Sequence, residues 1–293
     1  FVGPLGDWRA TEETDNHLIW NAFYGYDCRL MGLFAKILGQ DEDMRRFREL
    51  EEEAMRYWNA HFVDSETGKT IGLDGNTVDT QCSYALPLAY GMFDDENRER
   101  AFENLVRKTQ ELGCTIGTGF FGTGVLNRAL TDAGRPDLAY ELLLQTRFPS
   151  WLYPVTQGAT TIWERWDSYT LEKGFGGNNS MNSFNHYSLG SVLSWIYEAV
   201  LGILRDEAAP GYKHFTLRPV IVEDAGLDRA GGGFETAYGR IESRWSLTDG
   251  ILEYSCSVPP NTTATLILPG QEPMELGSGE YRYRIEMGER NGR

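Results

Sequence analysis

The chain has 293 residues, of which 41% are hydrophobic, so it can form one large domain or two domains of ordinary size. Its formal net charge is −16 and its sequence pI is about 4.7, which argues against a nucleic-acid partner and against binding to an anionic membrane surface. No run of about eighteen apolar residues predicts a membrane span.

The four cysteines are far apart and show no CxxC pair or other metal-binding spacing. Three of them fall on or beside apolar positions of predicted helices, so we expect buried free thiols. No cluster of histidines and carboxylates suggests a metal, and we expect no cofactor. The opening residues FVGPLGDW contain neither an initiator Met nor a signal peptide, so we expect a non-native start, and both cytoplasmic and secreted locations stay open.

From residue 13 to about residue 148 the sequence predicts consecutive helices separated by glycines and turn residues. The first helix has Thr11 and Thr14 as candidate N-caps. The second is densely charged along one face, which predicts a solvated surface. Nearly apolar segments then alternate with amphipathic segments, in the order 77–93, 94–113, 117–134 and 136–148.

This alternation of buried and amphipathic helices predicts two concentric helical layers, because most helices of a flat bundle would be equally amphipathic. We therefore expect a mainly α fold, an (α/α)6 barrel or toroid, over residues 1–207.

The segment after Phe148 has little helical period and is rich in glycine, asparagine, tryptophan and tyrosine, which favours a functional loop over a linker. Within it, TTIWERWDSY places Glu164 between Trp163 and Trp166. A carboxylate among aromatic faces is typical of a carbohydrate site. The alternative is a structural ion pair between Glu164 and Arg165 or Arg147.

A last apolar helix is predicted over 190–204. From about Pro210 the hydrophobic period becomes two, and TDG at 248–250 predicts a hairpin turn. The glycines of RAGGGFETAYGR precede a predicted strand rather than opening a helix, so phosphate binding there is disfavoured. We expect a small antiparallel β-sandwich domain over residues 208–293.

Five segments carry a more specific signal: GDW at 6–8, DTQCSYALPLAYGM at 79–92, GFFGTGVLNRALTDAGRPDLAYELLLQ at 119–145, GATTIWERWDSY at 158–169 and MNSFNHYSLGSVLSWIYEAVLGI at 181–203. In this order and spacing they resemble the α-L-rhamnosidases of glycoside hydrolase family 78 (GH78). The combination of TIWERWDS with a downstream MNSFNHY is specific, whereas GDW alone would be weak. The β-domain also resembles the family's C-terminal sandwich.

The resemblance implies a six-by-six α/α barrel and the hydrolysis of terminal non-reducing α-L-rhamnose from rhamnosides with inversion. By this resemblance Glu164 takes the position of the general base that activates water, His186 contacts the substrate, and Trp8 lines the sugar pocket. Structural roles stay open for His186, as a buried hydrogen-bonded side chain, and for Trp8, as a core residue.

Rhamnose carries a methyl group, so its site should combine apolar walls with a few polar groups that bind hydroxyls. Trp163 and Trp166 fit the walls, and Asp7 and Asn185 fit the polar groups. Asp7 could instead cap a helix.

Inverting hydrolysis needs two carboxyl groups about 6.5–9.5 Å apart. The family's general acid is a glutamate in a DCPxRDE-type motif upstream of GDW, and this sequence contains no such segment. We therefore expect a barrel incomplete at its N-terminus: a fragment, a chain completed by a second one, or a degenerate relative. Asp7 and Asp79 are the alternative acids.

An incomplete toroid would leave apolar faces of 77–93 and its neighbours open to water. We accordingly expect a missing N-terminal portion or a homo-oligomer partner, and little hydrolysis by the isolated chain.

Two other functions stay open on the sequence. The first is a non-catalytic sugar-binding protein that kept the aromatic pocket. The second is another α/α-toroid glycosidase, or a polysaccharide lyase with a base near a uronate and a Tyr or His acid.

Overall fold

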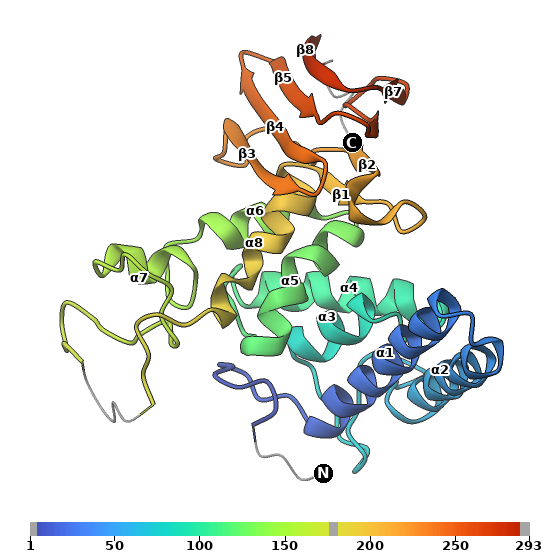
Figure 1. Ribbon diagram of the computed structural model, residues 1–293. Helices are drawn as coiled ribbons and strands as arrows, with labels where there is room; N and C mark the ends of the chain where they lie inside the picture. The colour runs from blue at the N-terminus through green and yellow to red at the C-terminus, as the bar shows by residue number, and fades with distance from the viewer. Residues whose placement is uncertain (1–4, 176–180, 288–293) are drawn as a thin grey trace. The chain divides into compact units, whose positions relative to one another are not determined.

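The computed structural model describes residues 5–175 and 181–287, which form two compact units divided between Val192 and Leu193. The first unit is helical and the second is mainly β-sheet (Figure 1).

The helices of the first unit follow each other in pairs: α1 (Asn16–Ile37) with α2 (Asp41–His61), α3 (Gln81–Ala89) with α4 (Asp95–Glu111), and α5 (Phe120–Asp132) with α6 (Pro136–Leu144). Each odd-numbered helix packs against the helix that follows it, and α3 also packs against both α1 and α5 (Figure 1). The odd-numbered helices therefore form one layer and their partners a second. This arrangement confirms the predicted concentric layers.

Capping residues explain where several helices begin. The N-cap of α1 is Asp15, whose carboxylate accepts a hydrogen bond from the His17 backbone N–H, so the predicted caps Thr11 and Thr14 were wrong. Helix α3 begins with a capping box in which Thr80 and Ser83 each accept from the other's backbone N–H. These side chains satisfy N–H groups that the first turn of a helix leaves unpaired.

The position of the exposed apolar surface differs from the prediction. All residues from Gln81 to Pro87 of α3 are buried, because α1, α4 and α5 surround this short helix. Five exposed apolar side chains instead follow one face of α1, at Trp20, Tyr24, Met31, Phe34 and Leu38.

The segment after α6 is mostly loop, with the short helix α7 (Leu152–Thr156) and the 3-10 turn η1 (Ser188–Ser191). The single helix predicted over 190–204 is wrong in two respects. It is a composite of α8 (Val192–Trp195) and the π-helical turn η2 (Ile196–Val200), and its predicted end is the strand β1 (Ile203–Arg205). Gly202, at φ +72°, makes the change of direction between them.

The second unit contains two four-stranded sheets. One has the order β1-β2-β6-β7, with β2 (His214–Leu217), β6 (Thr263–Leu266) and β7 (Met274–Leu276); the other has the order β3-β4-β5-β8, with β3 (Arg229–Thr236), β4 (Gly239–Thr248), β5 (Ile251–Val258) and β8 (Gly279–Glu286). The pairing of β2 with β6 is parallel and the other pairings are antiparallel, so the sandwich is not wholly antiparallel.

Two turns of this unit can be compared with the sequence. The predicted turn at 248–250 joins β4 to β5, with Asp249 at φ +51° and Gly250 at φ +72°. The sequence predicted that the glycine-rich stretch RAGGGFETAYGR precedes a strand. In the structure it forms β3, a turn and the start of β4. It therefore offers no helix N-terminus to a phosphate.

The end of the last helix packs within the β-rich unit, upstream of the domain boundary expected at 207/208, which stays a prediction. The indole N–H of Trp245 donates to the carbonyl of Val200 at 2.8 Å, and the hydroxyl of Ser243 donates to the carbonyl of Leu201 at 2.6 Å.

The cysteines Cys28, Cys82, Cys114 and Cys256 are all free and buried, which confirms the expectation of buried thiols. Within the described residues, no helix combines the length and the apolar character needed to cross a membrane.

Candidate active site

Two loop segments meet at Glu164. The backbone N–H of Glu164 donates to the carbonyl of Ser183 at 2.9 Å, and the N–H of Ser183 returns a hydrogen bond to Oε2 of Glu164 at 2.8 Å. A further bond from the N–H of His186 to the carbonyl of Ile162 continues this pairing. The TIWERWDS and MNSFNHY segments are therefore held side by side by their backbones.

Glu164 itself is a buried carboxylate, with only 6% of its surface exposed. Oε1 lies 3.7 Å from Nη2 of Arg9, and Arg9 also donates to the carbonyl of Met181 at 2.8 Å. Its guanidinium lies 4.6 Å from the centroid of the Trp8 ring. The cation that faces Glu164 is therefore Arg9, and not Arg165 as the alternative interpretation of the sequence suggested.

The surroundings of Glu164 favour its ionised form. Burial raises the pKa of this carboxyl, but the Ser183 N–H, a hydrogen bond from the Trp8 side chain and the charges of Arg9 and His186 outweigh it. The pKa of Glu164 is consequently lower than the ordinary value of a glutamate.

The segment that carries Trp8 is fixed by Asp7. The buried carboxylate of Asp7 accepts backbone N–H groups of Gly119 at 2.7 Å, Phe121 at 2.8 Å and Gly122 at 3.0 Å, at the beginning of α5. A carboxylate is favourable there because the helix N-terminus leaves N–H groups unpaired and carries partial positive charge. The geometry of Asp7 therefore matches the capping alternative that the sequence left open.

Gly119 permits this close approach of two segments. A Cβ at this position would lie 2.2 Å from the carbonyl oxygen of Trp8 and 2.3 Å from that of Asp7. The Phe120 N–H donates to the same Trp8 carbonyl at 2.9 Å. The beginning of α5 thus determines the position of Trp8.

His186 lies against aromatic rings. Its ring centroid is 4.7 Å from that of Phe120, and Tyr187 stacks on it at 5.5 Å with an interplanar angle of 10°. The Ser188 N–H donates to Nδ1 at 3.3 Å, so the proton of the neutral ring belongs on Nε2. Asn185, the neighbouring candidate, is exposed.

The two tryptophans beside Glu164 point into the protein. Trp163 and Trp166 are 7% and 5% exposed, and they make edge contacts with Phe184 at 5.3 Å and Trp151 at 5.9 Å, respectively. These contacts hold the loop that contains Glu164 against the rest of the unit. Trp166 also lines a cavity next to this loop.

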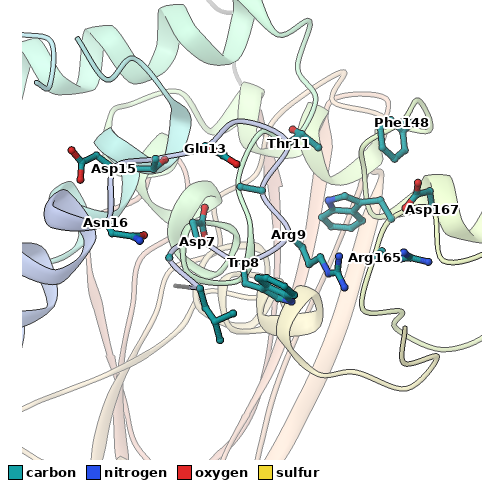
Figure 2. Close-up of a pocket in the computed structure, with 15 residues that line it drawn as sticks. Asp7, Trp8, Arg9, Thr11, Glu13, Asp15, Asn16, Phe148, Arg165 and Asp167 are labelled. Atoms are coloured by element: carbon teal, nitrogen blue, oxygen red, sulfur yellow. The ribbon is translucent and has the colours of Figure 1, made fainter. Parts of the chain in front are cut away.

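This cavity has a volume of about 690 Å³, which is within the usual range for a small-molecule site. Asp7, Trp8 and Trp166 line it, whereas Glu164 and His186 are not part of the lining. Figure 2 shows the guanidinium groups of Arg9 and Arg165 among the lining side chains, together with four carboxylates. These are Asp7, Glu13, Asp15 and Asp167. A lining with donors and acceptors of both charges suits a neutral ligand with hydroxyl groups.

The two alternative acids are poorly suited to donate a proton. Asp7 is occupied by three backbone N–H groups. Asp79 contacts Lys69 at 2.9 Å, Arg107 at 2.6 Å and the hydroxyl of Tyr84 at 2.6 Å. Burial raises the pKa of Asp79, but these three partners outweigh it and lower the pKa to about 2, so the group is ionised at ordinary pH.

No group of three or more His, Cys, Asp and Glu side chains within the described residues could hold a metal ion. The residues that the sequence did not identify are Arg9 and Ser183. Their only signal in the sequence is position: Arg9 directly follows Trp8, and Ser183 lies within MNSFNHY. Ser183 acts through its backbone N–H, so its residue type gives no signal.

Comparisons with known proteins give a consistent result. Residues 3–200 match the family model described as the bacterial alpha-L-rhamnosidase 6 hairpin glycosidase domain, and residues 202–282 match the bacterial alpha-L-rhamnosidase C-terminal domain. An alpha-L-rhamnosidase of Formosa agariphila is 37% identical over 258 residues, which cover 88% of this chain and 27% of that protein. One of Streptomyces avermitilis is 35% identical, with 96% and 28% covered.

Solved structures agree with these matches. The crystal structure of a Streptomyces avermitilis alpha-L-rhamnosidase complexed with L-rhamnose has a TM-score of 0.86 at 33% identity and covers 97% of this chain and 28% of that one. An Aspergillus terreus alfa-L-rhamnosidase gives a TM-score of 0.84 at 33% identity, with 97% and 32% covered. The chain thus spans less than a third of the length of these relatives.

Proposed function

The chain belongs to the bacterial α-L-rhamnosidase family, and from this premise we propose that it takes part in hydrolysing terminal non-reducing α-L-rhamnose from rhamnosides with inversion. In this proposal Glu164 is the general base. The observation that carries it is the burial of Glu164 together with a lowered pKa, at the junction of the two most specific motifs.

An inverting base must be ionised before the reaction and must take a proton from water as the water attacks the anomeric carbon. Arg9 and the Ser183 N–H stabilise the carboxylate form of Glu164 and fix its orientation. The bond to Ser183 engages Oε2, and Oε1 faces Arg9 at a distance longer than a hydrogen bond. Glu164 also accepts a hydrogen bond from the Trp8 side chain, but a carboxylate oxygen can accept more than one. We therefore assign Oε1, which does not bind Ser183, to the attacking water.

The remaining candidates divide by their geometry. We propose that His186 donates its Nε2–H to a sugar hydroxyl and that Trp8 supplies an apolar wall. Trp163 and Trp166 hold the loop in place, and the exposed Asn185 is free to contact a hydroxyl. Asp7 acts by fixing the segment that contains Trp8.

The leaving oxygen must also receive a proton, and neither Asp7 nor Asp79 is suited to supply it. A dinitrophenolate leaving group needs no protonation, so dinitrophenyl α-L-rhamnoside tests the base side alone. We expect the isolated chain to hydrolyse this substrate and to leave ordinary alkyl rhamnosides nearly untouched.

Glu164→Gln should lower the rate on the dinitrophenyl substrate by about 10²–10⁴-fold, the usual contribution of a general base. The matched control is Glu172→Gln, an exposed carboxyl of the same loop. Proton NMR of the first product should show β-L-rhamnose, as inversion requires. L-rhamnose binding without turnover of the activated substrate would contradict catalysis and favour the sugar-binding alternative. Equal loss in both variants would contradict the assignment of Glu164.

A further inference from the structure

The outer face of the sheet β3-β4-β5-β8 carries an unusual set of charges. Along β4, Ile241 and Trp245 point into the core and are buried, whereas Arg244 between them is exposed. Along β8, Arg282 and Arg284 are exposed in the same alternating manner. These three arginines therefore project from one face of the sheet.

The register places two of them in one row across three strands. Arg244 of β4 pairs with Ser255 of β5, and Ser255 pairs with Arg282 of β8. Adjacent strands are about 4.8 Å apart, so the two arginine Cα atoms are about 10 Å apart. Both side chains are long enough to reach one anion above Ser255. We refer to Arg244, Ser255 and Arg282 as the Arg–Ser–Arg row.

The row lies in a hollow surface. Two adjoining cavities, of about 520 and 190 Å³, both include all three residues of the Arg–Ser–Arg row. The larger cavity is lined by three arginines and one glutamate, Glu253, which gives a formal charge of +3 − 1 = +2 in a chain whose net charge is −16. The smaller cavity has no net charge, because Glu242 and Glu280 balance Arg244 and Arg282. A locally positive hollow on an acidic protein favours a local anionic ligand.

The arginines of the row are less closely paired with carboxylates than another arginine of this sheet. Arg240 contacts Glu242 at 2.7 Å and Glu235 at 3.4 Å. Arg244 forms a longer ion pair with the same Glu242, at 3.6 Å, and Arg282 makes no ion pair within the part of the chain that the structure describes. Two arginines that flank a serine repel each other, and a bound anion would remove this repulsion.

We propose that the Arg–Ser–Arg row binds the carboxylate of an acidic saccharide, a uronate-containing oligosaccharide. The planar guanidinium fork matches a carboxylate in a bidentate manner. The hydroxyls of Ser246 and Ser255 and the carboxylate of Glu253 supply acceptors and donors for the sugar hydroxyls. Only the choice of a saccharide rests on the proposed function; the anion site rests on the row.

The test measures binding to the full chain by isothermal titration calorimetry. The probe is β-1,4-linked tetra-glucuronate, and its neutral match is cellotetraose, which has a CH₂OH group in place of each carboxylate. The site variant is Arg244→Gln with Arg282→Gln. The control variant, Arg240→Gln with Arg218→Gln, loses the same charge at two other exposed positions of this unit.

We expect saturable binding of the tetra-glucuronate, weakened roughly tenfold in the site variant and by added salt, and unchanged within about twofold in the control variant. Cellotetraose should bind much more weakly. Equal affinity of the two tetrasaccharides, or equal loss in the two variants, would overturn the proposal. Sulfate that binds as tightly as the tetra-glucuronate would show an inorganic-anion site and would overturn the saccharide assignment.

Hydrolysis of the dinitrophenyl rhamnoside by the site variant separates this proposal from the function of Glu164. The row is in the second unit, so its substitution should leave the rate of dinitrophenyl rhamnoside hydrolysis unchanged. Binding and hydrolysis are measured separately, so the failure of one proposal can be distinguished from the failure of the other.

Discussion

At the scale of single residues, Glu164 shows how neighbours set the charge of a buried carboxyl. Burial alone would raise its pKa. Four groups oppose this: the Ser183 N–H, the Trp8 side chain, and the charges of Arg9 and His186. Arg9 is the nearest full charge and comes from a segment more than 150 residues away in the sequence.

Arg9→Gln should therefore raise the pKa of Glu164, because removing the guanidinium removes a charge that stabilises the carboxylate. The side-chain carboxyl carbon of Glu164, followed by ¹³C NMR during a pH titration, reports this directly and independently of activity. The matched control is Arg165→Gln, which removes an arginine that adjoins Glu164 in sequence but makes no ion pair with it within the described residues. An equal shift in both variants would contradict a specific role of Arg9.

Asp79 provides a second test at this scale, through stability. Its pKa is lowered to about 2 from an ordinary value of 3.8. A lowered folded-state pKa stabilises the fold above the unfolded pKa, and this contribution is lost as pH falls through the folded pKa. The loss should therefore occur between about pH 4 and pH 2, with a size on the order of 2 kcal/mol.

Urea denaturation at several pH values measures this contribution. Asp79→Asn should be less stable than the wild type at pH 5, with a difference that shrinks toward pH 2. Asp95→Asn, at a nearly fully exposed carboxyl, is the control and should show a much smaller difference. A pH-independent difference for Asp79→Asn would show that its ion pairs with Lys69 and Arg107 contribute little.

At the scale of elements, the beginning of α5 is a junction between distant parts of the chain. Asp7 caps this helix from 112 residues away, and the Trp8 carbonyl accepts a hydrogen bond from Phe120. The helix that begins here thus fixes the GDW segment, and with it one wall of the proposed sugar site.

Gly119→Ala tests this junction. The new Cβ would lie 2.2 Å from the backbone oxygen of Trp8, a contact that only a backbone shift can relieve. We expect a loss of stability of about 1–3 kcal/mol, together with a changed fluorescence of Trp8. Gly32→Ala, within α1, is the matched control, because its Cβ would meet only an ordinary contact at 3.7 Å, with Phe47 of α2. That variant should be neutral or more stable, as alanine favours a helix. Unchanged stability of Gly119→Ala would mean that the segments adjust freely.

At the scale of the whole molecule, the exposed face of α1 determines how the isolated chain behaves. Its apolar side chains are spaced by three, four and seven residues, so they line one stripe, at Trp20, Tyr24, Met31, Phe34 and Leu38. An exposed apolar stripe of this kind favours association.

We therefore expect the purified chain to self-associate in sedimentation velocity experiments as its concentration rises from about 1 to 100 μM, because association buries apolar surface. Met31→Glu combined with Phe34→Glu should reduce the association. Leu171→Glu, at an equally exposed leucine outside the stripe, should not. Association that persists in the double variant would place the contact elsewhere.

The sequence by itself determined the elements with strong periodicity. The alternation of apolar and amphipathic segments predicted the helical pairs, and the period of two predicted most of the strands. The role of Glu164 as general base stays a prediction, which came from the resemblance of TIWERWDS to the family's motif, because residue type and local context alone left an ion pair open. The helix predicted through Ile203 failed, because the pairing of β1 with β2 overrides local preference.

Only the tertiary structure decided which groups surround Glu164 and what Asp7 does. Arg9, Ser183 and the capping of α5 by Asp7 all join residues that are far apart in the chain. Ion pairs and backbone hydrogen bonds depend on distance in space, and a sequence orders residues only along the chain. The same reason hid the Arg–Ser–Arg row until the strand register was known.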